Sequence, residues 1–572
     1  MSTKAERRCL NAFTVALSQA YEEGEKCWYT STLELQVASL EFCRVCRGVP
    51  TLGANVEDQT PRSLWSPRAA HGGPTTRDSK KVCFSSRVPV VRALCLTWAL
   101  PLEVLVKTAA TELWQRSAVL HLRGSVSARS LQSVPWPHKL RKLYFNGCNF
   151  NEPVARVAWP ASLQQLYFGE CFNRCIYRVV WPASLQQLSF GKSFNQPITR
   201  VVWPASLQRL PFGNHFDQPI AGVVWPASLQ RLSFGERFNR PIAGVAWPAS
   251  LQQLSFGECF NRCIYRVVWP ASLQQLSLGK SFNQPIAGVV WPACLQRLPF
   301  GNHFDQPVVG VAWPASLQQL SFGERFNRPI AGVVWPDSLR QLSFGRSFNQ
   351  PITGVVWPTC LQLLSAGNGF NQPIAGVVWP ASLQQLLVFG HRFNQPIKGV
   401  GWPPSIRQLS FGDSFDQPIN AVAWPASVQN VSFGHEFNQP IAGVVWPASL
   451  QQLSFGNRFN QPVVGVAWPT CLQQLSFGFH FNQPIAGVKW PASLQQLSFG
   501  FFFNEPISGV VWPASLRQLS FGRNFHQPIT GVVWPASLQQ LSFGHHFSQP
   551  IAGVGWPTCL PPTSVVGYDF FE

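Results

Sequence analysis

The sequence repeats with a period of 22 residues from about residue 131 to residue 560. The pair Trp-Pro recurs 20 times between Trp136 and Trp556, and 17 of the 19 intervals between these Trp residues are 22 residues long. The other two intervals are 23 residues long. A fixed period of this length is typical of solenoids, in which each turn buries its apolar face by stacking on its neighbours. The repeat therefore predicts one long array rather than several separate globular domains.

Each repeat contains one segment with the pattern of a short strand. One unit reads L-Q-Q-L-S-F-G-x-x-F-N-Q-P-I-A-G-V-V-W-P-A-S, and its L-x-x-L-x-F segment lies between Pro and Gly. The period of two predicts that Leu188 and Phe190 point inward and that Gln187 and Ser189 point outward. Pro residues punctuate the return path and favour an extended chain over a helix. The sequence therefore predicts a mainly β solenoid of about twenty 22-residue turns with one long parallel sheet.

Some positions of the repeat hold the same residue in every copy. The set of equivalent positions in successive copies is called a column here. The Phe of F-N-Q-P-I is Phe in all 19 copies, and neither the first Val of G-V-V-W nor the Trp changes. An exposed column of indoles would stack bases or sugars, but its invariance beside an invariant Val favours an interior ladder. The position after the Phe is Asn in 14 copies and otherwise Asp, His or Ser. These short polar side chains bond local backbone, so we expect a ladder that satisfies buried loop amides.

The two residues between Gly and Phe vary most. They are Asn214 and His215 in one turn, Glu236 and Arg237 in the next, and Phe501 and Phe502 further along. We expect these positions, called here the variable edge, to face solvent along one edge of the sheet.

The repeat divides the chain into four segments. Residues 1–90 carry no repeat and form a poorly defined N-terminal segment. Residues 91–130 are predicted to form a helical cap, because residues 102–114 have apolar side chains at the spacing of an amphipathic helix that covers the open end of the sheet. Residues 131–560 form the array, and residues 561–572 form a C-terminal tail.

Composition bears on the compartment. The 15 Cys residues are irregularly spaced and form no secreted disulfide framework, which favours an intracellular and cytoplasmic protein. The longest apolar run, from Ala93 to Val106, contains Pro101 and Glu103 and is shorter than the roughly 20 residues that span a bilayer. No membrane association is therefore expected.

The repeat resembles a known family. The residues F-N-Q-P-I followed by W-P-A-S-L-Q-Q-L-S-F-G resemble the FNIP repeat, a relative of the leucine-rich repeat, across residues 131–560. The resemblance implies a leucine-rich-repeat-like solenoid that mediates protein contacts. FNIP proteins often carry an F-box ahead of the array, and residues 100–105 resemble the opening of one, although the second half of an F-box is missing.

No group of residues in the sequence predicts catalysis. An active site needs unlike groups that converge, whereas a uniform array repeats the same Gln, Ser and Asn at every turn. The sequence contains no Gly-x-Ser-x-Gly, phosphate-binding Gly-Lys-Ser or His-Glu-x-x-His motif. Cys43 and Cys46 have the spacing of half a zinc site, but no second pair follows. We therefore expect no enzyme activity, no metal and no cofactor.

Charge is concentrated in the first half of the array. Residues 131–346 hold 20 basic and 8 acidic residues, net +12, whereas residues 347–572 hold 7 and 6, net +1. A basic surface favours an acidic protein or a nucleic acid as partner. Three Arg residues replace a strand Gln, and four of the basic residues at the variable edge lie alongside them. The candidate binding residues are Arg209, Arg231, Arg297, His215, His303, Arg237 and Arg325.

The sequence thus favours a non-enzymatic interaction scaffold whose strand face and variable edge contact a partner protein. Two alternatives stay open. One is an F-box-type substrate adaptor for a ubiquitin ligase, and the other is binding of nucleic acid or another polyanion by the basic half.

Overall fold

The computed structural model describes residues 94–96, 115, 117–122, 126–145, 149–387, 390–560 and 565–566. The chain divides into two units, residues 1–169 and residues 170–572. The units are described separately below.

The described part of unit 1 holds four strands and one short helix. The strands are β1 (Leu94–Leu96), β2 (Val119–Leu122), β3 (Lys142–Phe145) and β4 (Gln165–Tyr167), and they pair in parallel in this order. Helix α5 (Ala128–Ser133) begins after Ser127, whose hydroxyl accepts a hydrogen bond of 3.1 Å from the Ser130 N–H. The parallel ladder thus starts with β1, ahead of the first Trp-Pro repeat. Residues 97–114, which include the expected cap helix and the F-box-like segment, lie outside the described residues.

Unit 2 has one three-residue strand per turn and ends with a shorter one. Each three-residue strand begins at the position of the third residue of L-Q-Q-L and includes the Leu position and the next residue. The strands are β5 (Gln187–Ser189), β6 (Arg209–Pro211), β7 (Arg231–Ser233), β8 (Gln253–Ser255), β9 (Gln275–Ser277), β10 (Arg297–Pro299), β11 (Gln319–Ser321), β12 (Gln341–Ser343), β13 (Leu363–Ser365), β14 (Gln385–Leu387), β15 (Gln408–Ser410), β16 (Asn430–Ser432), β17 (Gln452–Ser454), β18 (Gln474–Ser476), β19 (Gln496–Ser498), β20 (Gln518–Ser520), β21 (Gln540–Ser542) and β22 (Val565–Val566).

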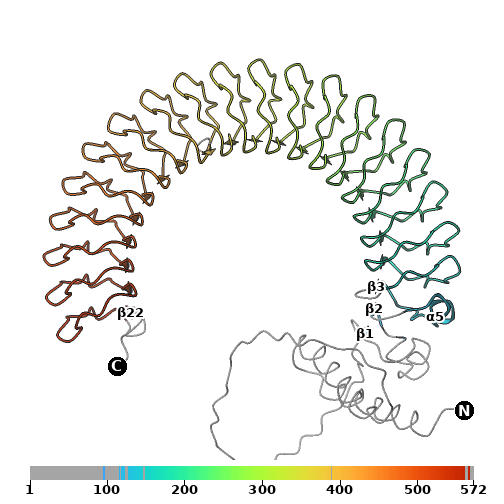
Figure 1. Ribbon diagram of the computed structural model, residues 1–572, viewed down its shortest axis with the longest axis horizontal. Helices are drawn as coiled ribbons and strands as arrows, with labels where there is room; N and C mark the ends of the chain where they lie inside the picture. Colours follow the sequence, from blue (N-terminus) through green and yellow to red (C-terminus); the bar gives the residue numbers. More distant parts are fainter. Residues whose placement is uncertain are drawn as a thin grey trace, which may run out of the picture. The chain divides into compact units, whose positions relative to one another are not determined.

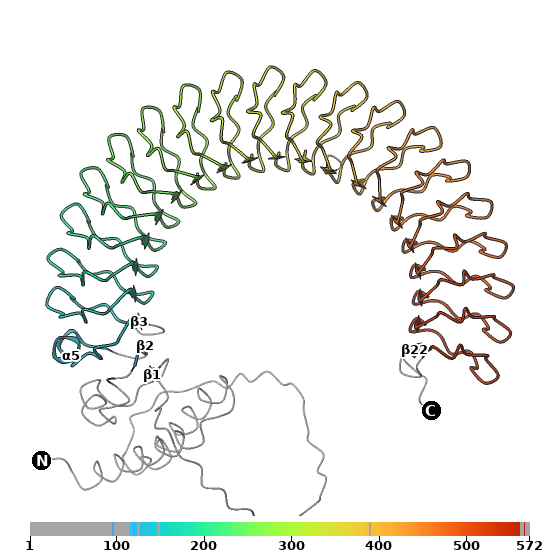
Figure 2. The same ribbon diagram turned by 180° about the vertical axis from the view of Figure 1, so that it is seen from behind.

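The strands of unit 2 are parallel and in register. Leu453 of β17 lies opposite Leu475 of β18, so residues one repeat apart are neighbours in the sheet. Unit 2 curves as an arc with its strands along the inner side and the loops on the outer side (Figures 1 and 2). This inner side is called the concave face below. The predicted mainly β solenoid with one parallel sheet is confirmed.

The core of unit 2 is a set of stacked apolar columns. Leu188 and Phe190 are buried, as predicted, whereas Gln187 and Ser189 are partly exposed. In most turns the Phe that follows the strand packs on the Phe of F-N-Q-P-I, and for Phe455 and Phe459 the ring centroids are 4.1 Å apart. Equivalent Phe rings of successive turns are also stacked, with Phe459 and Phe481 at 6.1 Å. Aromatic stacking thus continues between turns and ties each turn to the next.

The Trp column lies inside the solenoid. Trp225 is buried and Trp247 half-buried, and their rings stack with centroids 6.4 Å apart. Phe234 packs against Trp225, and Phe256 packs against Trp247, each pair in a T-shaped arrangement. The indole N–H groups of Trp225 and Trp247 are buried without a hydrogen-bond acceptor. The interior ladder predicted for this column is confirmed, so the indoles do not serve as open stacking platforms.

The Asn column forms the predicted hydrogen-bonded ladder. Asn460 Oδ1 accepts one bond from the Asn482 N–H at 2.9 Å and another from Gln483 Nε2 at 3.1 Å, both in the next turn. Where the column holds Asp416, its carboxylate accepts the equivalent bonds from Asn438 and Gln439. Each side-chain oxygen therefore satisfies an amide of the following loop, which the strands leave without a partner.

Replacement of Asn460 by Leu tests the ladder. The Asn482 N–H loses its acceptor, and we expect the free energy of unfolding of the adjacent turns to fall by about 1–3 kcal/mol. Amide hydrogen exchange at residue 482 measures the loss, and Asn460→Asp is the matched control because Asp416 already accepts these bonds. Equal protection of residue 482 in both variants would contradict the ladder.

Candidate functional site

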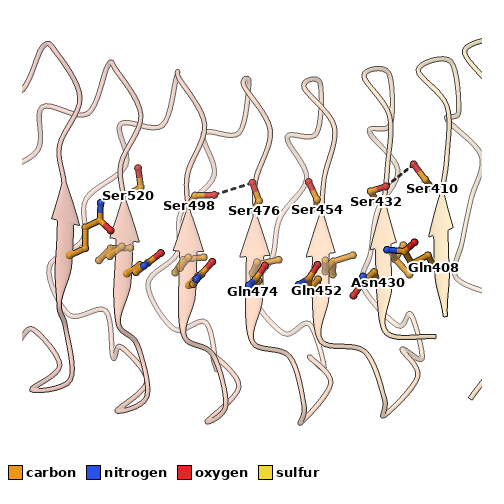
Figure 3. A pocket seen from close by; sticks show the side chains of 18 of the residues that line it. Gln408, Ser410, Asn430, Ser432, Gln452, Ser454, Gln474, Ser476, Ser498 and Ser520 are labelled. Atoms are coloured by element: carbon orange, nitrogen blue, oxygen red, sulfur yellow. Dashed lines mark hydrogen bonds between the residues drawn. The ribbon is translucent and has the colours of Figure 1, made fainter. Parts of the chain in front are cut away.

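The concave face of unit 2 carries a shallow groove along the strands. Its second half is lined by the first and third residues of strands β15 to β21, which are almost all Gln and Ser (Figure 3). The Ser432 hydroxyl donates to Ser410 at 2.9 Å, and the Ser498 hydroxyl donates to Ser476 at 2.9 Å. Gln408 and Gln452 are exposed at the equivalent strand position. This half of the groove thus presents uncharged amides and hydroxyls that can donate and accept hydrogen bonds.

Charge enters the first half of the concave face through Arg residues at the same strand position. Arg209, Arg231 and Arg297 begin strands β6, β7 and β10, and all three are exposed. Arg209 and Arg231 lie opposite each other on neighbouring strands. No carboxylate of the described residues forms an ion pair with any of the three. Their positive charge is therefore uncompensated at this surface.

The other four candidates lie at the variable edge, directly after the strands. His215 and Arg237 are exposed in consecutive turns, and so are His303 and Arg325. Backbone hydrogen bonds hold this edge in place, since the Arg237 N–H donates to the Asn214 carbonyl at 2.8 Å. The prediction that the edge faces solvent is confirmed, and its backbone is regular although its side chains differ.

The structure gathers the candidates into two groups rather than one site. Arg209, Arg231, His215 and Arg237 belong to the turns of β6 and β7, whereas Arg297, His303 and Arg325 belong to those of β10 and β11. Strands β8 and β9 separate the groups, a gap of roughly 14 Å between β7 and β10 at the usual strand spacing. The near-identical 88-residue blocks 169–256 and 257–344 explain the recurrence, since they reproduce three of the positions.

Some other charges of the first half are neutralised by ion pairs between turns. Lys192 lies 2.7 Å from Glu170, and Arg240 lies 2.8 Å from Asp217. The hydrogen bond that Lys192 donates to Glu170, together with the negative charge of that carboxylate, raises the pKa of Lys192 above its ordinary value. Lys280 pairs with Glu258 in the same way, with its pKa also raised. These pairs leave the three strand Arg residues as the distinctive charges of the concave face.

Sequence reasoning did not select an aromatic cluster at the variable edge. Phe479, Phe501 and Phe502 stand in two successive turns and contact one another. The signal was available, because no other turn of unit 2 has a Phe, Tyr or Trp at these two positions. The repeat pattern places these residues on a solvent-facing edge and indicates nothing more about them.

Among the described residues, no three His, Cys, Asp or Glu side chains group closely enough to hold a metal ion. None of their helices has the length and apolarity needed to cross a membrane.

Comparison with known proteins identifies the repeat. The FNIP Repeat family matches ten stretches that together cover more than half of the chain, namely 150–193, 172–215, 194–237, 216–259, 238–281, 326–369, 393–436, 437–480, 481–524 and 503–546. A search of curated proteins gives no match.

A solved structure agrees with this family. The crystal structure of CroV588, described as a novel circular leucine-rich-repeat protein, is 40% identical with a TM-score of 0.74. The match covers 79% of this chain and 66% of that one, so this chain spans slightly less than two thirds of the length of CroV588. The Toll–Spatzle complex of Drosophila is 12% identical, with a TM-score of 0.46 and coverage of 66% and 60%. The repeats, the solenoid and the family match together show that this chain belongs to the FNIP repeat family of leucine-rich-repeat-like proteins.

Proposed function

We propose that the chain is a non-enzymatic scaffold that binds a partner protein along the concave face and the variable edge. One observation carries the proposal: the variable edge holds side chains that differ between turns and three strand positions of the concave face hold Arg in place of Gln, while the side chains that build the solenoid are nearly constant and buried. A rigid sheet with a variable surface supports recognition over many turns, as in other solenoids.

Crosslinking tests the scaffold. The full chain captures proteins from lysate at low and high salt, and crosslinks are then mapped to its residues. We expect partners that survive high salt and crosslinks at the strand positions and the variable edge. Crosslinks confined to the outer loops, or capture that requires residues 1–130 alone, would contradict the proposal, and the second result would favour the F-box-type adaptor.

The uncompensated Arg residues suggest that the first half receives an acidic partner. We expect the triple variant Arg209→Gln, Arg231→Gln and Arg297→Gln to bind a labelled polyglutamate peptide about tenfold more weakly than the parent chain, at roughly 0.5 kcal/mol for each exposed charge. Fluorescence anisotropy at two salt concentrations measures this change, because screening weakens contacts between exposed charges.

A matched control lies in the second half of the array. Arg407 and Arg517 are exposed one residue before the strand, and their replacement by Gln is expected to change affinity less than twofold. Equal losses in both variants would remove the basic face from the proposal. Tighter binding of a single-stranded oligonucleotide than of polyglutamate, with a steep salt dependence, would favour the nucleic-acid alternative.

A further inference from the structure

An exposed aromatic cluster marks the variable edge after strands β18 and β19. Phe479 exposes 41% of its surface and Phe502 exposes 38%, while Phe501 is half-buried between them. Contiguous exposed apolar side chains, unlike singly scattered ones, mark interaction sites on soluble proteins. The solenoid does not require them, because equivalent edge positions hold Asn457 and Ser414 in other turns.

The rings pack on one another. Phe479 and Phe501 stack with centroids 4.5 Å apart, and Phe502 meets Phe479 edge to face at 5.2 Å. The His480 ring stacks on Phe502 at 5.1 Å. The backbone fixes the cluster as well, since the Phe502 N–H donates to the Phe479 carbonyl at 3.0 Å. A cluster held in this way loses little conformational freedom when a ligand binds.

The edge positions next to the cluster carry cations and no carboxylate, and Glu505 stands in the loop that follows them. The Arg523 guanidinium lies over the Phe501 ring, 5.6 Å from its centroid, and forms no ion pair with a carboxylate of the described residues. The edge positions from residue 457 to residue 546 contain Arg458, Arg523 and three His residues but no Asp or Glu. Arg458 is already paired with Glu436 at 2.6 Å. The charge that complements this surface is therefore negative, with Arg523 as its free cation.

The ring geometry favours a polypeptide over a nucleic acid. Bases bind to single aromatic rings by stacking on an open face. Phe501 has Phe479 from the preceding turn against one face and Arg523 from the following turn against the other. One face of Phe502 is covered by His480. What the cluster offers is a compact apolar surface of ring edges, which suits an inserted apolar side chain.

We propose that Phe479, Phe501 and Phe502, with Arg523 beside them, form the docking site for an acidic polypeptide segment that carries an apolar anchor residue. The anchor packs on the phenyl rings, and a carboxylate of the same segment pairs with Arg523. This proposal rests on the scaffold function and adds the place and the chemistry of one contact.

A library of random twelve-residue peptides displayed on phage tests the proposal against the full chain. The test variant is Phe479→Asn with Phe502→Ser, which places at both positions residues that other turns already hold, so the fold is retained. The control variant is His391→Asn with Arg392→Ser, which makes a similar exchange at another turn of the variable edge. Circular dichroism of both variants checks that the solenoid is intact.

We expect enriched peptides that combine carboxylates with at least one large apolar residue. Synthesised singly, they should bind the test variant at least tenfold more weakly than the parent and the control variant within twofold. Arg523→Gln should lower the affinity about threefold to tenfold and reduce its dependence on salt. Absence of any peptide that depends on Phe479 and Phe502, or enrichment of peptides without acidic residues, overturns the docking site.

Two further results separate this proposal from the scaffold function. Peptides that bind both edge variants equally but fail with the triple Arg variant leave the scaffold in place and refute the docking site. A single-stranded oligonucleotide whose binding depends on Phe479 and Phe502 also refutes it, in favour of nucleic acid. If no peptide binds and no crosslinked partner maps to the array, both proposals fail.

Discussion

Replacement of Phe459 by Ala should lower the free energy of unfolding of the surrounding turns by about 3–5 kcal/mol. Phe459 is fully buried, its ring lies 4.1 Å from Phe455 in the same turn, and it stacks on Phe437 and Phe481 in the turns on either side. Truncation therefore removes contacts within one turn and at both of its interfaces. Since turns contact only their neighbours, the loss is local and amide hydrogen exchange measures it better than a single melting temperature.

The chain offers a control for this result at the other Phe column. Leu278 replaces the strand Phe in one natural turn and is buried there. Phe455→Leu repeats that exchange and should cost only about 1–1.5 kcal/mol, because most of the volume is kept. Equal losses of amide-exchange protection in Phe459→Ala and Phe455→Leu would contradict the large contribution to stability that we expect from the Phe in F-N-Q-P-I.

The sequence predicted the fold of the array because every turn repeats the same constraints. Leu188 and Phe190 point inward since the strand period and the apolar pattern agree. The Asn ladder was also predictable, because only short polar side chains occupy a column beside an invariant Phe. One feature of the buried Trp column was not predicted: the indole N–H of Trp225 has no hydrogen-bond acceptor, which no pattern of residue types reveals.

The site was less predictable, because function depends on differences between turns rather than on the repeat. Exposure of Arg209, Arg231 and Arg297 followed from the strand pattern, but their lack of carboxylate partners required coordinates. Similar Arg residues elsewhere are neutralised, as Arg240 is by Asp217. The helical cap expected in residues 91–130 and the F-box-like segment remain predictions, since the residues that would form them lie largely outside the described part of the chain.

Replacement of Gly456 by Ala should disrupt the stack of turns between β16 and β17. A Cβ atom at residue 456 would lie 1.5 Å from the Gly434 carbonyl oxygen and 2.4 Å from its carbon. Both are backbone atoms of the preceding turn, and the neighbouring bond from the Arg458 N–H to the His435 carbonyl, at 2.9 Å, opposes their movement. We expect a loss above about 4 kcal/mol, which few single substitutions reach. Limited proteolysis between residues 430 and 460 and local hydrogen exchange measure it.

A substitution at an outer-loop glycine distinguishes the effect of backbone strain from the effect of close contact between turns. Gly443 has φ +74°, and a Cβ atom there would meet no atom within 4 Å. Gly443→Ala should therefore cost only the strain of a left-handed residue, about 1–2 kcal/mol. The chain already tolerates this conformation in other residues, since Arg178 and Arg266 take φ 63° and 62° at the equivalent position. Equal losses at Gly443 and Gly456 would contradict contact between turns as the reason for glycine at the sheet edge.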